Sequence, residues 1–267
     1  MKRNILILAA IFAVSIVSAQ DLTSKKGEPM LPEGGEYALG ADATPFLNYF
    51  GNFIGGNGLN AAPVFAPHPL ASGGTGPLGF AIYGKKFIDA QNAYRATVRL
   101  GITSATTRTF VPDLDSGADP GDVVEDKATT STTGVTIGLG KEMRRGNTRL
   151  QGVYGAAAQL SFASMNTSFE YGNDIEDMGS ALIEMKTGST FTFGVGVFGG
   201  VEYFFVPKMS IAGEYGWGLA FTSTGDGETT TEVDGGDDVV TQTGGSSTFI
   251  LDTAALDSFN LRVMFHF

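Results

Sequence analysis

Apolar and polar residues alternate along several stretches of the chain, most regularly in the last nine residues, FNLRVMFHF. One face of this segment carries five residues: Phe259, Leu261, Val263, Phe265 and Phe267. Successive side chains of a strand point to opposite sides, so the other face carries Asn260, Arg262, Met264 and His266. The pattern predicts a strand with one apolar face, which a soluble sheet could also present.

The same alternation predicts eight strands from Glu36 to the end of the chain. Their expected ranges are 36–50, 78–88, 94–106, 131–143, 148–170, 189–206, 210–223 and 247–267. Pro45 is expected to break the register of the first strand, since proline has no N–H for the ladder. Asp252 and Asp257 interrupt the alternation of the last strand, which predicts a bulge or a stretch above the membrane there.

The links between these strands alternate in length. Short links are expected at 89–92, 145–147 and 207–208, and long ones at about 51–77, 107–130, 171–188 and 224–246. This alternation predicts an all-β fold, an eight-stranded antiparallel up-and-down transmembrane β-barrel with four long extracellular loops and three short periplasmic turns. Several strands exceed the roughly 9–11 residues that cross a bilayer, so we expect the hairpin of 148–170 and 189–206 to project outside.

The first 19 residues have the three-part layout of a cleavable secretory signal peptide. A basic start (MKRN) precedes an apolar run over 5–17, and the small residues VSA stand before Gln20. The run is too short to span a bilayer comfortably, and a short N-terminal anchor is the alternative. We therefore expect a signal peptide at 1–19, a periplasmic lead-in at 20–34 and the β-barrel domain at 35–267.

The composition narrows the class further. Beyond the signal the chain has no apolar run of helical spanning length, yet it holds 38 glycines and 20 phenylalanines with only 17% charged residues. A secreted chain of this kind fits the closed barrel, the other structure that a bilayer permits. Removing Lys2 and Arg3 with the signal changes the net charge from −11 to −13, so binding of nucleic acid through the net field is not expected. Disulfides and lipid attachment at cysteine are excluded, because the chain has no cysteine.

Two segments, GEYALGADATPFLNYFGN and GGVEYFFVPKMSIAGEYGWGL, resemble those of uncharacterised barrel proteins from Bacteroidota. The chain is thus similar to the small bacterial outer-membrane β-barrel proteins of the OmpA/OmpX-like superfamily, over nearly all of its mature length. The C-terminal strand ending at Phe267 also resembles the strand by which such barrels are recognised for insertion. The resemblance implies the outer membrane of a Gram-negative bacterium, contact with outer-membrane lipid and lipopolysaccharide, and insertion by the barrel assembly machinery. It implies no catalytic residues.

The side of the strands opposite the apolar face should line the barrel. It collects seven charged residues: Asp42, Lys85, Arg95, Arg99, Glu202, Glu214 and Arg262. Each Arg or Lys facing lipid would cost about 2–4 kcal/mol at mid-bilayer, so these residues are expected to point inward. Eight strands enclose a lumen just wide enough for their own side chains. A salt-bridged plug is therefore expected, with a gated conduction path as the alternative.

Charge also separates along the expected barrel axis. Basic residues stand beside the short turns: Lys85, Lys86, Lys141, Arg144, Arg145, Arg149 and Lys208. Acidic residues fill three long loops: Asp113, Asp115, Asp119, Asp122, Glu125, Asp126, Asp174, Glu176, Asp177, Glu184, Asp226, Glu228, Glu232, Asp234, Asp237 and Asp238. These carboxylates are expected to keep the loops solvated, with divalent cations shared with lipid phosphates as the alternative. None of the runs has the spacing of an EF-hand loop, and no metal site is assigned.

Two features suggest enzymes at first sight. Residues 194–199 (GVGVFG) match the dinucleotide fingerprint, but that motif works only where a strand turns into a helix, and here a strand continues. The two histidines are His68, in the first long loop, and His266. No serine and acid are expected beside either one in the arrangement that nucleophilic catalysis needs. We therefore expect a protein without enzymatic activity and without a cofactor.

The leading functional hypothesis is an integral outer-membrane barrel with a closed lumen, acting in envelope integrity or in contacts made by its surface loops. The first alternative is a narrow channel, or a lateral path for small or hydrophobic solutes. A second is an accessory subunit of an envelope complex. A soluble secreted β-sandwich is the rival fold.

Overall fold

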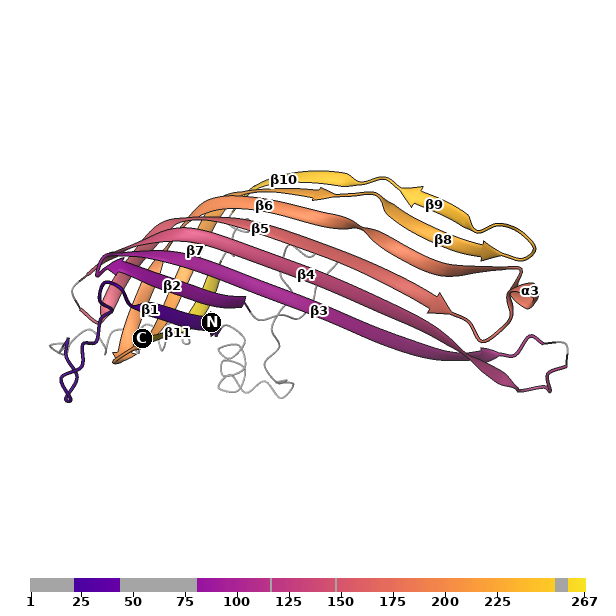
Figure 1. Cartoon of the computed structure of the whole chain (residues 1–267), viewed down its shortest axis with the longest axis horizontal. Helices are drawn as coiled ribbons and strands as arrows, with labels where there is room; N and C mark the ends of the chain where they lie inside the picture. Colours follow the sequence, from indigo (N-terminus) through magenta and orange to yellow (C-terminus); the bar gives the residue numbers. More distant parts are fainter. Residues whose placement is uncertain (1–21, 44–80, 116, 147, 253–258) are drawn as a thin grey trace, which may run out of the picture.

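A computed structural model of the chain describes residues 22–43, 81–115, 117–146, 148–252 and 259–267, and shows one antiparallel β-sheet (Figure 1). Its strands are β1 (Tyr37–Asp42), β2 (Ala81–Asp89), β3 (Asn92–Pro112), β4 (Val123–Arg145), β5 (Leu150–Glu170), β6 (Ser180–Val206), β7 (Met209–Thr224), β8 (Gly227–Val233), β9 (Val239–Thr243), β10 (Ser246–Asp252) and β11 (Phe259–His266). A short helix, α3 (Ile175–Met178), precedes β6. No helix within the described ranges is long and apolar enough to cross a membrane.

Eight of these strands close on themselves. Each strand from β1 to β6 pairs antiparallel with the next, β7 pairs with β11, and β11 pairs back with β1 from Ala38↔His266 to Asp42↔Arg262. The predicted all-β, antiparallel architecture is confirmed, and the ring contains the expected eight strands. β8, β9 and β10 were not expected as separate strands. β10 and β11 pair with consecutive parts of β7, and, apart from Ser246, both lie within the predicted eighth strand. Residues 253–258 lie outside the described residues.

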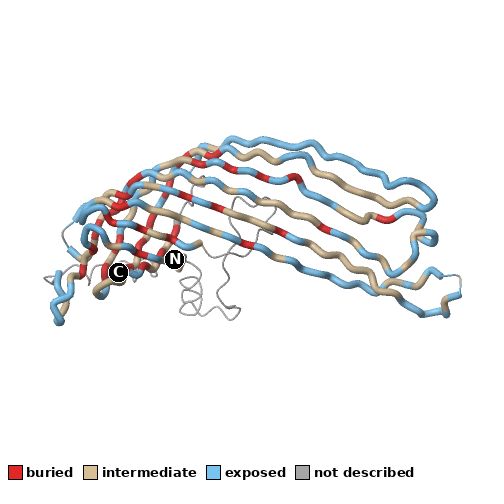
Figure 2. The backbone as a smooth tube through the Cα atoms, in the orientation of Figure 1, coloured by how far each residue is buried: buried red, intermediate tan, exposed pale blue. Residues whose placement is uncertain are grey.

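Burial alternates along the ring strands. On β11, Arg262, Met264 and His266 are buried whereas Phe265 and Phe267 are exposed. Figure 2 shows the buried residues concentrated at the ring end of the sheet. The apolar part of this core is a cluster of Ala38, Tyr83, Phe87, Ala93 and Met264. The interior of the ring is thus packed with charged and polar groups together with this apolar cluster, while most of the other large apolar side chains lie on the exterior.

Short turns join neighbouring ring strands at one end. Between β2 and β3, the backbone N–H of Gln91 donates to Asp89 Oδ1 at 2.7 Å. Between β6 and β7, Lys208 adopts a left-handed φ of 64° and its ammonium pairs with Glu36. Both chain ends that the structure describes lie near these turns (Figure 1).

β3, β4, β5 and β6 continue far beyond the ring and form a projecting sheet, which β8 and β9 extend on the β6 side (Figure 1). The four long strands span 21, 23, 21 and 27 residues. The predicted loops at 107–130, 171–188 and 224–246 were therefore wrong in large part, because strands run through much of each. More than the expected hairpin projects: the β3–β4 and β8–β9 hairpins do so as well.

The projecting sheet is rich in threonine, a residue that favours strands because it branches at Cβ. Hydroxyl pairs join neighbouring strands: Thr106 with Thr129 at 2.9 Å, and Thr130 with Thr167 at 3.0 Å. Such cross-strand pairs stabilise a sheet in which few large apolar side chains are buried.

Several predictions fall outside the described residues. These are the signal peptide at 1–19, the register break at Pro45, and the first long loop with His68. In the lead-in, Thr23 and Pro29 form an isolated bridge and Met30 is buried. The domain boundaries at 19 and 34 stay predictions.

Candidate functional site

The outward face of the ring is apolar up to a sharp limit. On β3, Val98, Leu100 and Ile102 are exposed, with Ile102 at 70%, and the next outward residue is Ser104. The same change from apolar to polar occurs on neighbouring strands: Val135 to Thr133, Phe162 to Ser164, Phe221 to Ser223 and Phe249 to Ser247. An exposed apolar band that ends at a similar height on five strands is typical of a surface that faces lipid.

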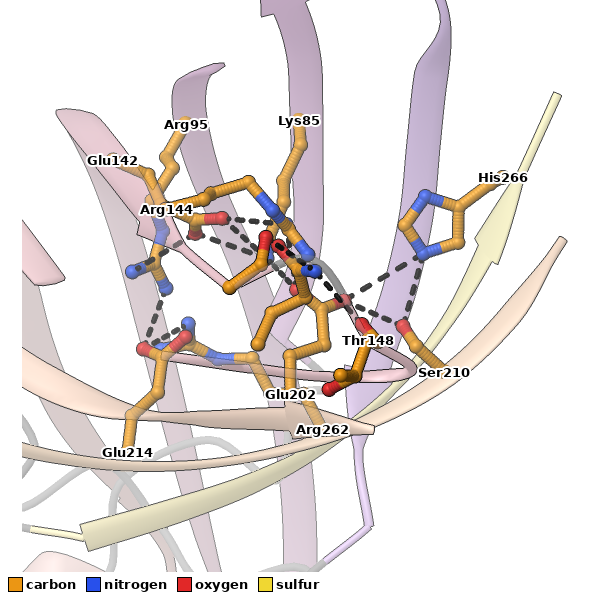
Figure 3. Close-up of polar contacts among 12 residues, drawn as sticks. Lys85, Arg95, Glu142, Arg144, Thr148, Glu202, Ser210, Glu214, Arg262 and His266 are labelled. Atoms are coloured by element: carbon orange, nitrogen blue, oxygen red, sulfur yellow. Dashed lines mark hydrogen bonds and ion pairs between the residues drawn. The ribbon is translucent and has the colours of Figure 1, made fainter. Parts of the chain in front are cut away.

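Inside the ring, seven charged side chains form one connected network (Figure 3). They come from six strands: Lys85 on β2, Arg95 on β3, Glu142 and Arg144 on β4, Glu202 on β6, Glu214 on β7 and Arg262 on β11. We call this set the luminal network. All its members are buried except Arg95, whose side chain is 11% exposed.

The three carboxylates of the luminal network each join two or more cations. Glu142 contacts Lys85 at 2.9 Å, Arg144 at 2.9 Å and Arg95 at 3.6 Å. Glu202 contacts Lys85 at 3.0 Å and Arg144 at 2.7 Å. Glu214 accepts from Arg95 at 2.8 Å and from Arg262 at 2.7 Å. Charges removed from water are tolerated only when paired and hydrogen-bonded, and the network supplies that pairing across the whole ring.

Aromatic rings surround the cations of the network. Arg95 lies 4.0 Å from the ring centroid of Phe198, and Arg262 lies 3.9 Å from that of Tyr83. Arg144 lies between Phe87 and Phe204, at 5.3 and 5.4 Å. Cation–π attraction strengthens when water is excluded, so these rings fix the guanidinium groups in place and fill the lumen around them.

The structure brings together five of the seven residues expected in the lumen: Lys85, Arg95, Glu202, Glu214 and Arg262. The other two, Asp42 and Arg99, are half-buried on the same side of their strands and have contacts of their own. In the register of β1 and β11, Asp42 is the neighbour of Arg262.

Sequence reasoning missed two members of the luminal network, Glu142 and Arg144. Arg144 lies beside a short turn as expected, since its backbone N–H donates to the carbonyl of Gln91, but its side chain is buried at the centre of the network. The signal was present, because Gly138, Gly140, Glu142 and Arg144 share one face of β4. Ending the predicted strand at Met143 hid this continuation.

His266 lies in the same interior, beside a serine and an acid that were not expected there. Its Nε2 is 2.9 Å from Ser210 Oγ, which donates to Glu202 Oε1 at 2.5 Å. In a catalytic triad the acid would orient the other ring nitrogen, whereas Glu202 is 3.6 Å from Nε2 itself and Nδ1 has no hydrogen-bond partner. Ser210 is fully buried, so the trio lacks both the geometry and the access of a nucleophilic site.

A small cavity lies inside the ring, on the side of the network away from the turns. Its volume is about 60 Å³, and its polar lining includes Arg95, Gln159, Glu214, Asn260 and Arg262. A water needs about 10–15 Å³ of such space, so the cavity holds a few water-sized groups and no drug-sized ligand.

Exposed ion pairs cover the outward face of the projecting sheet. Lys186 contacts Glu184 at 2.7 Å and Glu228 at 3.6 Å. The hydrogen bond from Lys186, assisted by one from Asn166, lowers the pKa of Glu184, and the pKa of Lys186 is raised chiefly by the bond to Glu184. On the other side of the sheet, partial burial raises the pKa of Tyr171, helped by the charge of Asp126. These pairs keep the sheet solvated.

Two other kinds of candidate site are a dinucleotide site and a metal site. The segment 194–199 lies inside β6, which runs to Val206 and turns into β7, so no helix receives a dinucleotide there. The described residues contain no group of three or more His, Asp or Glu side chains placed to hold a metal ion.

Comparisons with known proteins give little more. No protein-family model matches the chain, and no curated protein matches it. Among solved structures, the chain is similar to a major outer membrane protein from Thermus thermophilus, with 12% identity and a TM-score of 0.38 over 87% of this chain and 98% of that one. Such a low TM-score marks only a partial resemblance.

Proposed function

We propose that the chain is an integral outer-membrane β-barrel without enzymatic activity, whose lumen is sealed and whose projecting sheet forms a contact surface outside the cell. The observation that carries this proposal is the distribution of side chains over the ring. Seven ion-paired charged residues lie inside it, and an exposed apolar band lies outside. A soluble sandwich would place these two groups the other way round.

The sealed lumen rests on the luminal network. Its ion pairs reach from β2 to β11 across the ring, and aromatic rings fill the space between them. A conducting path would need water along the axis, but Glu142, Arg144 and Glu202 are at most 1% exposed. The network therefore acts as a plug.

The contact surface rests on the shape of the projecting sheet. It extends well beyond the apolar band, and its end carries the β3–β4 turn, α3 and the β8–β9 turn together (Figure 1). These segments, 113–122, 174–177 and 234–238, contain acidic residues and no lysine or arginine. Lipopolysaccharide next to the barrel is the proposed surrounding, and insertion is proposed to depend on the barrel assembly machinery through the strand ending at Phe267.

Planar-bilayer recording tests the sealed lumen. The wild-type protein should show no steady conductance. The double variant Glu142→Ala/Arg144→Ala removes one charge of each sign and the bulk of both side chains, so it should open small, frequent steps. The gel mobility of unboiled samples confirms that the variant is folded. Steady wild-type conductance would instead favour the narrow channel, for which the cavity beside Arg95 would be the first binding position.

A further inference from the structure

A row of alternating aromatic and basic side chains crosses the outward face of the ring close to its short turns. Tyr37 on β1 pairs with Lys86 on β2, Lys86 pairs with Tyr94 on β3, and Tyr94 pairs with Lys141 on β4. All four residues are exposed, and the ammonium of Lys86 lies 5.5 Å from the ring centroid of Tyr37. Neighbouring strands lie about 4.8 Å apart, so the backbones of the two lysines are about 10 Å apart with Tyr94 between them. We call this set the turn-end row.

The turn-end row lies at one border of the apolar band. Tyr94 and Ser104 both point outward on β3 and are ten residues apart. At about 3.3 Å per residue and a strand tilt of about 40°, this separation covers about 25 Å along the barrel axis, the height of the apolar band of outer-membrane barrels. Ser104 marks the other border. The turn-end row is therefore at the level where lipid head groups begin, and tyrosine is typical of that level.

The two lysines of the turn-end row have no ion-pair partner among the described residues. The other described lysines in strands each contact a carboxylate: Lys85, Lys127 and Lys186. The carboxylate of Asp89, in the β2–β3 turn, accepts hydrogen bonds from Gln91 and Asn92. Lys141 attracts that carboxylate only weakly by comparison. The row thus presents two positive charges that the described chain does not neutralise.

We propose that the turn-end row binds the phosphate of an anionic phospholipid. The inference rests on the proposed outer-membrane barrel, whose orientation makes the surrounding lipid the periplasmic leaflet. A phosphate above Tyr94 lies within reach of both flexible lysine stems, and the hydroxyl of Tyr94 donates to it between them. The row has no carboxylate for the amine of a zwitterionic head group, so a lipid with net negative charge is preferred.

The outward positions next to the row leave space for the acyl chains of such a lipid. Moving from the row into the apolar band, Gly84 follows Lys86 and Ala96 follows Tyr94, and these two residues pair with each other. Leu139 follows Lys141 and is 65% exposed. Small residues beside an exposed leucine form a shallow apolar surface directly behind the phosphate position. The same lipid can therefore contact the lysines with its head group and the band with its chains.

Native mass spectrometry of the full chain tests the proposal, with the protein released from detergent that contains equal amounts of phosphatidylglycerol and phosphatidylethanolamine. Retention of phosphatidylglycerol should exceed that of phosphatidylethanolamine by about 20-fold, since each lysine near an anionic lipid raises affinity about fivefold. Lys86→Gln/Lys141→Gln should bring the two lipids to equal retention. The control Lys127→Gln/Lys186→Gln makes the same charge change on the projecting sheet and should keep the preference.

Equal retention of the two lipids by the wild type would overturn the proposal, as would a preference that survives in Lys86→Gln/Lys141→Gln. Excess inorganic phosphate should not displace the bound lipid, because the acyl chains also contribute, and displacement would contradict a lipid site. Heat-modifiable gel mobility separates two kinds of failure. A heat-modifiable wild type without lipid preference refutes the head-group site alone, whereas a wild type whose mobility does not change on boiling refutes the barrel on which the site rests.

Discussion

At the residue scale, Glu202 is the most heavily shared group of the luminal network. It contacts Lys85, Arg144 and Ser210, and lies near His266. Its two cationic partners are buried, so they cannot turn to water when the carboxylate is lost. The energetic weight of the plug should therefore concentrate here.

Glu202→Gln should destabilise the folded protein by about 3–5 kcal/mol, because it leaves buried positive charge uncompensated. The matched control is Glu228→Gln. The partner of Glu228 is the exposed Lys186, at 3.6 Å, so this substitution should cost less than about 1 kcal/mol of folding free energy. Urea unfolding in lipid vesicles, followed by the fluorescence of the single Trp217, measures both. Equal losses for the two variants would contradict the role of the network.

Most of this interior was visible in the sequence, because charged residues on an alternating strand have only one acceptable side. Lys85, Arg95 and Arg262 could be placed inside for that reason. What the sequence could not provide was the partner of each charge. Which charges meet across the ring depends on the relative height of strands that are distant in the chain, such as β2 and β6. The alternation within one strand carries no information about that relative height.

At the element scale, the free-energy cost of introducing a charge on the outward face of β3 should depend on the position along the strand. Val98→Arg lies within the apolar band and should cost about 2–4 kcal/mol, whereas Ser104→Arg lies beyond it and should cost about 0–1 kcal/mol. Both residues point outward on the same strand. The same vesicle unfolding experiment measures the two costs. A larger cost for Ser104→Arg than for Val98→Arg would contradict the assignment of the apolar band to lipid.

The strands of the ring were predicted well, and those of the projecting sheet were not. In the ring, lipid on one side and packed side chains on the other impose a strict period of two. Beyond Ile102 most residues of β3 are exposed on both sides of the strand, so the alternation disappears although the strand continues to Pro112. Threonine-rich segments such as 129–133 were the remaining signal, since branching at Cβ favours a strand without regard to polarity.

At the scale of the whole molecule, charge and shape agree on one orientation. The basic turn end carries Lys208, Lys86 and Arg145, and the acidic end lies at the far tip of the projecting sheet (Figure 1). Strands of 21 to 27 residues exceed what a bilayer needs, so the surplus must lie on one side of it. The proposed orientation places that surplus outside the cell, with the short turns in the periplasm.

Single-cysteine labelling in intact Gram-negative cells tests this arrangement most directly, because the natural chain has no cysteine. Asp119→Cys places a thiol in the β3–β4 turn, and Gln91→Cys places one in the β2–β3 turn. A membrane-impermeant maleimide should label the first variant in intact cells, and the second only after the outer membrane is permeabilised. Equal labelling of both in intact cells, or labelling of Gln91→Cys alone, would contradict the proposed barrel and its orientation.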